Sequence, residues 1–216
     1  MKSSEEYQLE IAQWCAQHKP THTYQYQVPV LGEGGTCSLF GELDPIPFDL
    51  EQELTVPQLQ LVPEVQKLVD WVQQHTKVDW FGVYLARENN KQEKVLTKLA
   101  YFGAPSRAEF PLTAQFAQIS NNTAVGISGE KRTINDVEQY MKDGGEYYTC
   151  DPKVKSELCW PITTSKSIDT VEHTNSILGI IDAECFFVNS FDIQTQQIFD
   201  AVCAQLTDII INPNNI

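Results

Sequence analysis

The chain has 216 residues and a formal net charge of −14, from 29 acidic and 15 basic residues. This length fits one sizeable core, and a hydrophobic share of 42% is ordinary for a globular fold. Because no Lys/Arg-rich stretch offsets the acidic balance, nucleic acids and anionic membranes are excluded as expected partners. The N-terminus lacks the apolar core of a signal peptide and no later run is long enough to span a membrane, so we expect a cytoplasmic protein.

The first part of the chain predicts one helix and an irregular extension. Apolar residues at helical spacing predict an amphipathic helix over residues 5–18, which Pro20 closes. Residues 21–56 mix short β-prone patches with glycines and prolines and read as an irregular segment. We therefore divide the chain into an N-terminal helix and extension, residues 1–56, and one domain, residues 57–216.

The domain begins with a helix and two strands. Pro63 suits a first helical turn, and an apolar stripe at helical spacing follows it. Residues 79–87 and 95–102 predict strands, because they are rich in β-branched and aromatic residues. The polar stretch 88–93 between them predicts a hairpin turn.

The second half of the domain predicts a long excursion, two more strands and a last helix. Residues 116–119 predict a short helix, residues 133–137 a short strand, and residues 138–155 a long loop. Antiparallel strands follow over 156–162 and 176–185, and a final helix begins at a cap at Asn189 or Ser190 and ends at Asn212. This order predicts an α+β fold whose helices cover mainly one face of a central antiparallel sheet.

Two predicted strands carry residues suited to a binding site. With the two-residue period of a strand, Trp80, Gly82 and Tyr84 share one face, and Asp182 and Glu184 share one face. The two rings are equally compatible with a hydrophobic core, but the glycine between them favours a cavity wall. Clustered carboxylates raise each other's pKa, so that one can hold a proton at neutral pH. These residue types suit a small zwitterion.

Three segments together resemble the free methionine-(R)-sulfoxide reductase family, which has the GAF fold. They are 79–85 (DWFGVYL), Cys150-Asp151 followed by Ser156-Glu157, and 179–184 (GIIDAE), and the resemblance covers Pro57 to the C-terminus. It implies that Cys150 is the catalytic thiol, attacking the sulfoxide sulfur and becoming a sulfenic acid. The resemblance also implies that the catalytic carboxylates are Glu157, Asp182 and Glu184. The implied substrate-binding residues are Trp80, Tyr84 and Asp151. The family has aspartate at the position of Glu184.

The chain departs from the family pattern at two upstream cysteines. Arg107 or Ala108 falls near the first of these positions and Ala117 near the second, and no cysteine lies between Cys37 and Cys150. The family's usual intramolecular disulfide therefore cannot form. Three outcomes remain open: Cys37 acts as a substitute resolving thiol, an external thiol such as a thioredoxin-like protein reduces Cys150 directly, or the activity has been lost.

The leading hypothesis is therefore a sulfoxide reductase with Cys150 as nucleophile. The alternatives are a non-catalytic GAF module that binds a small molecule, and an interaction protein whose residues 1–56 mediate homodimerisation. We expect no metal or cofactor, because the six cysteines show neither CxxC pairs nor zinc-ligand spacing.

Overall fold

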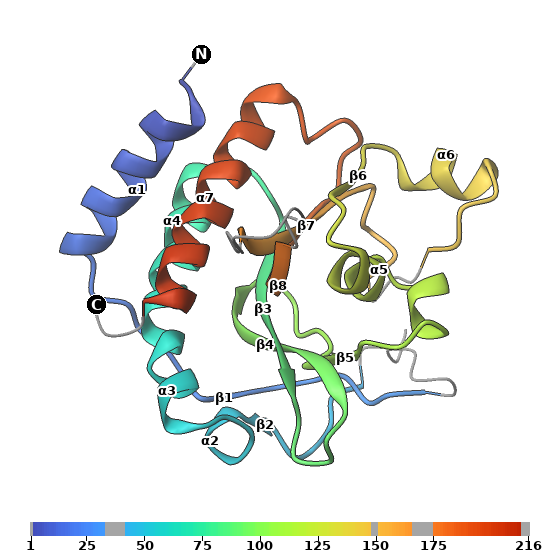
Figure 1. Ribbon diagram of the computed structural model, residues 1–216. Helices are drawn as coiled ribbons and strands as arrows, with labels where there is room; N and C mark the ends of the chain where they lie inside the picture. Colours follow the sequence, from blue (N-terminus) through green and yellow to red (C-terminus); the bar gives the residue numbers. More distant parts are fainter. Residues whose placement is uncertain (1, 33–41, 148–150, 166–174, 213–216) are drawn as a thin grey trace, which may run out of the picture.

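A computed structural model describes residues 2–32, 42–147, 151–165 and 175–212 (Figure 1). Its centre is an antiparallel sheet of six strands in the order β5-β4-β3-β8-β7-β6. The strand bounds are β3 Trp80–Glu88, β4 Lys94–Phe102, β5 Glu109–Pro111, β6 Arg132–Ile134, β7 Ser156–Ser165 and β8 Asn175–Cys185. The predicted α+β class and its four main strands are confirmed.

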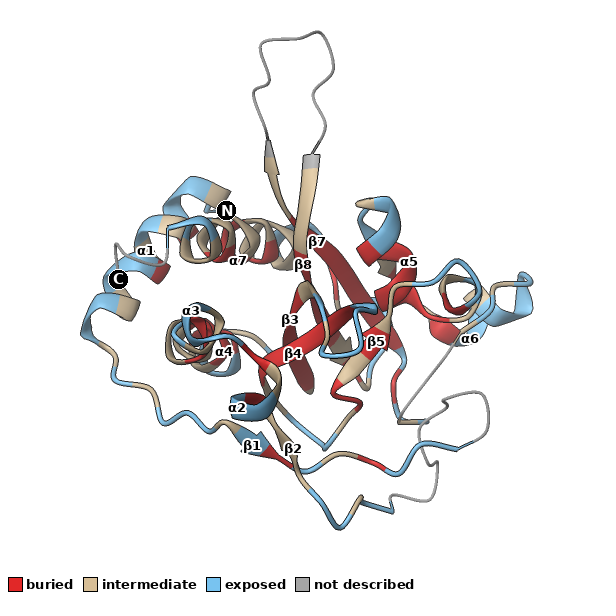
Figure 2. Cartoon of the chain, turned by 60° about the horizontal axis from the view of Figure 1, so that its bottom comes forward, coloured by how far each residue is buried: buried red, intermediate tan, exposed pale blue. Residues whose placement is uncertain are grey.

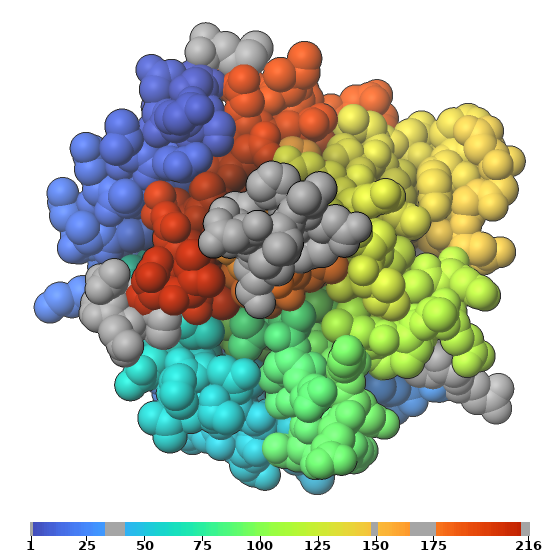
Figure 3. Space-filling view, in the orientation of Figure 1, coloured from blue at the N-terminus to red at the C-terminus, as the bar shows by residue number. Residues whose placement is uncertain are grey.

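Two long helices, α4 Leu61–His75 and α7 Ile193–Ile211, cover one face of this sheet, and a third, α1 Ser4–Gln17, packs against their outer side (Figures 1 and 2). Their ends follow from capping: the Ser3 side chain accepts from the Glu6 amide at the start of α1, and Asp192 accepts from the Thr195 amide at the start of α7. In the space-filling view, α1 in blue lies directly against α7 in red (Figure 3).

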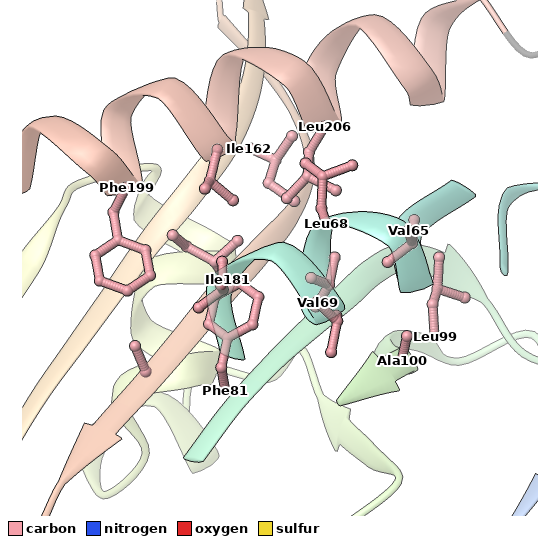
Figure 4. Packing of buried hydrophobic residues seen from close by; sticks show 14 of the residues in the cluster. Val65, Leu68, Val69, Phe81, Leu99, Ala100, Ile162, Ile181, Phe199 and Leu206 are labelled. Atoms are coloured by element: carbon pink, nitrogen blue, oxygen red, sulfur yellow. The ribbon is translucent and has the colours of Figure 1, made fainter. Parts of the chain in front are cut away.

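The main hydrophobic core lies between this helical layer and the sheet. Phe81 and Val83 of β3 point into it and are fully buried. Figure 4 shows Phe81 and Ile181 of β8 between Phe199 of α7 and Val69 of α4. Burying a side chain of this size stabilises the fold by about 1.5–3 kcal/mol. The burial of these apolar residues therefore determines which face of β3 packs against the helices and which lies on the opposite side of the sheet.

The N-terminal extension packs onto the same body. It contains β1 Gln25–Tyr26 paired with β2 Phe48–Asp49, and the short helix α2 Leu50–Glu53; the next short helix, α3 Val56–Leu59, begins at its last residue. Arg87 of β3 joins it to the sheet, because its guanidinium, with a side chain only 4% exposed, donates to Glu53 at 3.2 Å and to Glu109 at 2.8 Å. The Tyr26 hydroxyl donates to the Lys98 carbonyl at 2.7 Å. The extension is therefore anchored to strands β3 and β4.

Several sequence predictions need correction. The strand predicted over 133–137 is the shorter β6 Arg132–Ile134. The helix α6 Val137–Lys142 follows and extends into residues 138–155, which were predicted as a loop; Asp136 caps it by accepting from the Gln139 amide. The last helix is capped by Asp192 and not by Asn189 or Ser190; Asn189 instead has a positive φ of 57°. Strand β5 and the helix α5 Asn121–Ser128 were not predicted, whereas the short helix at 116–119 is confirmed as the 3-10 turn Phe116–Gln118.

Candidate functional site

The face of the sheet opposite the main core carries the predicted site residues. In the register of β3 and β8, Trp80 lies opposite Glu184 and Gly82 opposite Asp182, and in that of β7 and β8, Glu157 lies opposite Glu184. Residues opposite each other in antiparallel strands project to the same side. We call this the carboxylate face; its members are Trp80, Gly82, Tyr84, Lys98, Glu157, Cys159, Asp182 and Glu184.

The carboxylates of this face are held by the first turn of α5. Asn121 donates to Glu157 at 3.1 Å and Asn122 donates to Asp182 at 2.9 Å, and both carboxylates are nearly buried, at 4% and 5% exposure. Tyr147 also hydrogen-bonds to Glu157. The second oxygen of Asp182, Oδ1, is buried and accepts no hydrogen bond from the residues that the structure describes. A buried carboxylate oxygen of this kind is costly unless a ligand or a proton satisfies it.

The sequence analysis missed α5, although its end signals are present. Ser120 caps the helix by accepting from the Thr123 amide, and Gly129 ends it in the left-handed conformation at φ 69°. The run Asn121-Asn122-Thr123 is typical of a loop, which obscured these signals. In the fold the same two asparagines are buried donors aimed at carboxylates.

Burial raises the pKa of all three carboxyl groups. Burial is the largest cause for Asp182, and the neighbouring charge of Glu157 raises its pKa further. Burial is also the largest cause for Glu184, whose pKa is raised further by the charges of Asp182, Glu157 and Asp151. The pKa of Glu157 is raised by burial against the lowering effect of its hydrogen bonds to Tyr147 and Asn121. Because the three groups interact, they titrate as a coupled set, in which each negative charge favours the protonated form of its neighbours.

Trp80 and Tyr84 form the aromatic part of the carboxylate face. The Trp80 indole donates to the Ala104 carbonyl at 2.9 Å, and the buried Tyr84 ring packs edge-on against Phe110 with centroids 5.4 Å apart. The sequence suggested that Gly82 leaves room for a ligand, but the Trp80 ring itself occupies that space: a Cβ at Gly82 would lie 2.4 Å from the indole Cη2. Gly82 thus lets the indole lie flat on the sheet.

A Gly82→Ala substitution should therefore displace the indole. The clash should cost about 1–3 kcal/mol of unfolding free energy, the usual cost of overpacking, measured by denaturant titration. The same substitution in a Trp80→Phe background is the control, because the shorter phenyl ring lacks the atoms that collide. Equal costs in the two backgrounds would contradict this interpretation.

Lys98 is a member of the carboxylate face that the sequence analysis did not single out. It lies opposite Tyr84 on β4 and is fully buried. Its ammonium donates to the Ser106 carbonyl at 2.9 Å and hydroxyl at 2.7 Å, and lies over the rings of Tyr101, Tyr26 and Trp80 at 3.9, 5.0 and 5.7 Å. Burial lowers its pKa well below the usual value, against the opposing charges of Asp182 and Glu184.

The structure bears only indirectly on the predicted thiols. Cys150 and Cys37 lie outside the described residues. Asp151, the next residue after Cys150, is near enough to Glu184 for its charge to raise the pKa of that carboxyl. Cys159 is on the carboxylate face, but burial and then Asp182 raise the pKa of its thiol well above the usual value, which favours an unreactive neutral thiol.

Arg107 stands near the first missing cysteine position of the family pattern. Its carbonyl accepts from the Tyr84 hydroxyl at 3.5 Å, and its guanidinium lies over the rings of Phe110 and Phe116, at 5.4 and 4.9 Å. This side chain is nearly buried and supports the aromatic wall. A structural cation therefore occupies this part of the site.

Comparison with known proteins places the fold. No family model and no curated protein matches the sequence. Among solved structures, a type II free methionine-R-sulfoxide reductase from Thermoplasma acidophilum matches at 16% identity and TM-score 0.55, covering 70% of this chain and 94% of that one. The GAF domain of an Acinetobacter phosphoenolpyruvate-protein phosphotransferase matches at 15% identity and TM-score 0.57, covering all of both chains.

A third match is free methionine-R-sulfoxide reductase from Neisseria meningitidis in complex with its substrate, at 14% identity and TM-score 0.56, covering 74% of this chain and 87% of that one. These matches show that the protein has a GAF-like fold, as the sequence resemblance implied. Enzymes and other GAF domains are both among the neighbours, so the fold by itself does not choose between them.

Other sites are few within the described ranges. No group of metal-ligating side chains occurs in the part of the chain that the structure describes, and none of its described helices is both long and apolar enough to cross a membrane. A surface groove of about 610 Å³ lies between the end of α4 and the start of α7 and contains none of the predicted site residues.

Proposed function

We propose that this protein reduces free methionine-(R)-sulfoxide, or a closely related small sulfoxide, with Cys150 as the nucleophilic thiol. The observation that carries the proposal is the convergence of Glu157, Asp182 and Glu184 on one sheet face, with pKa values raised by burial. A sulfoxide oxygen needs a proton as it leaves sulfur, and a carboxyl group that stays protonated near neutral pH can supply it.

The reaction requires one thiol and one proton donor. The Cys150 sulfur attacks the sulfoxide sulfur while a carboxyl of the set protonates the oxygen. The oxygen then passes to the cysteine as the methionine thioether departs, so that the sulfoxide is reduced and Cys150 is oxidised to a sulfenic acid. Two thiols from a donor then restore Cys150, leaving a disulfide and water.

Substrate binding is assigned to the remaining residues of the site. Carboxylates that are not protonated attract the ammonium group of the amino acid, and Asp151 adds a further negative charge next to Cys150. The Trp80 ring suits the methyl-sulfinyl end, because sulfur packs favourably against aromatic rings. Cys37 as an internal resolving thiol, and a thioredoxin-like protein as an external donor, remain the two candidate routes of recycling.

A turnover assay tests the proposal. Full-length protein with dithiothreitol should convert L-methionine-(R)-sulfoxide into methionine, followed by mass spectrometry. A Cys37→Ser variant should keep multiple turnover if the external thiol acts directly, and should stall after one turnover with a thioredoxin-like donor if Cys37 is the resolving thiol. Absence of any reduction with either donor would overturn the enzymatic proposal.

One observation favours a second function. Lys98 and Arg107 are two buried basic residues near the site, and Arg107 or Ala108 falls near a position where the family pattern has a cysteine. A GAF module that binds a small molecule without turnover would need such fixed charges and no reactive thiol. Binding of methionine sulfoxide without consumption would favour this function.

A further inference from the structure

Lys98 and the carboxyl groups lie on the same buried face but do not form an ion pair within the described structure. Among the described residues, no carboxylate lies within ion-pair distance of the Lys98 ammonium, which instead donates to Ser106. Asp182 and Glu184 are nevertheless near enough for their charges to act on the pKa of Lys98. Separated, dehydrated charges are unfavourable, and a ligand that contacts both would offset that cost.

The geometry points to Lys98 as the residue that binds the α-carboxylate of the ligand, while the acidic side chains take its ammonium. This rests on the proposed function and extends it, because it restricts the substrate to free amino acids with an unblocked carboxylate. Within the described structure the third N–H of the Lys98 ammonium has no hydrogen-bond acceptor.

Asp182 supplies the matching end of the site. Its Oδ2 accepts a hydrogen bond from Asn122. Its Oδ1 is buried in a residue that is only 5% exposed and has no partner among the described residues. Asp182 on β8 lies opposite Gly82, and Lys98 on β4 lies opposite Tyr84, so the two side chains flank β3 from its two neighbouring strands. The Lys98 ammonium lies 5.7 Å from the centre of the Trp80 ring. A zwitterion lying across the Trp80 ring would contact the two ends with its two charged groups.

The alternative is that Lys98 is purely structural, holding the turn at Ser106 beneath the Tyr101 ring. The two roles differ in their ligand dependence. Loss of a structural residue weakens the binding of every ligand, whereas loss of a carboxylate-binding residue weakens only ligands that have a carboxylate.

Calorimetric titration of full-length protein with two ligand pairs separates these roles. The pairs are L-methionine sulfoxide with its primary amide, and L-methionine with its primary amide; the amides keep the ammonium and lose the carboxylate. Wild-type protein should prefer each free amino acid by about 10- to 100-fold, as a charge-assisted hydrogen bond implies. Lys98→Met, which keeps the length and removes the charge, should abolish this preference and leave amide binding unchanged.

Two further variants keep the test decisive. Lys94→Met, on the exposed end of the same strand, should keep the wild-type preference. Lys98→Gln serves if Lys98→Met does not fold by circular dichroism. Equal weakening of all ligands, or an unchanged preference, would overturn the inference.

The outcomes separate this inference from the proposed function. Reduction of the sulfoxide and its amide at equal rates would support the reductase and overturn the role of Lys98. A Lys98-dependent preference for free amino acids without any reduction would support the role of Lys98 and overturn the reductase. Binding of none of the four probes would overturn both.

Discussion

Replacing Cys150 with serine should abolish methionine-sulfoxide reduction entirely. The hydroxyl of serine is a far weaker nucleophile than a thiolate and cannot form a sulfenic acid, so no residual thiol route remains if the assignment is correct. Turnover is measured as methionine formed, and the oxidised enzyme is trapped with dimedone and located by peptide mass spectrometry. In wild-type protein the label should fall on Cys150.

Cys15→Ser provides the matched control. Cys15 lies in α1, outside the carboxylate face, and burial raises the pKa of its thiol to about 11. This variant should keep wild-type turnover. Labelling of Cys159, together with activity in Cys150→Ser, would move the nucleophile to β7 and refute the assignment.

Asp182→Asn should slow reduction by roughly 10²-fold or more, because it removes one carboxyl of the set that together supplies the proton and holds the substrate ammonium. The same variant should be more stable than wild type at pH 8. Burial raises the pKa of Asp182, so between the unfolded value of about 3.9 and the higher folded value the unfolded chain holds fewer protons than the native one. The stability contribution of this group therefore falls as pH rises through that window.

Thermal melts at pH 4, 6 and 8 measure this effect. Each unit of raised pKa corresponds to about 1.4 kcal/mol, and a chain of this size gains about 2–4 °C in Tm per kcal/mol. The difference between variant and wild type should be near zero at pH 4 and grow toward pH 8. Asp192→Asn is the control, and its effect on Tm should have the opposite sign. The hydrogen bonds that Asp192 accepts as a helix cap lower the pKa of this carboxyl, so the charged side chain stabilises the fold at high pH. A Tm for Asp182→Asn below that of wild type at pH 8 would contradict the raised pKa.

The parts of the site on regular strands could be predicted from the sequence, and the parts held by irregular segments could not. A strict two-residue period sufficed to place Trp80 and Tyr84 together, and Asp182 with Glu184. Lys98 follows the same period on β4, but a lysine within an apolar strand is ordinarily assigned to solvent. Only the burial of its neighbours shows that it points inward.

The α5 helix was missed for a different reason. Its first turn consists of residues with weak helix propensity, and the helix is stabilised by tertiary contacts of Gly126, where a Cβ would lie 2.8 Å from Leu112 and 2.9 Å from Leu96. Close packing at a glycine depends on partners distant in sequence. The donors Asn121 and Asn122 therefore could not be assigned to the site before the fold was known.

Alternate residues of β3 face two different surroundings, the helical layer on one side and the carboxylate face on the other. Phe81, Val83 and Leu85 are constrained by the packing of helices, whereas Trp80, Gly82 and Tyr84 face the carboxylates and are constrained by what lies there. A substitution on one side leaves the other side's contacts intact, so ligand preference can diverge through evolution without loss of architecture. The match of this chain to GAF-like folds at 14–16% identity is consistent with such a division between the two faces.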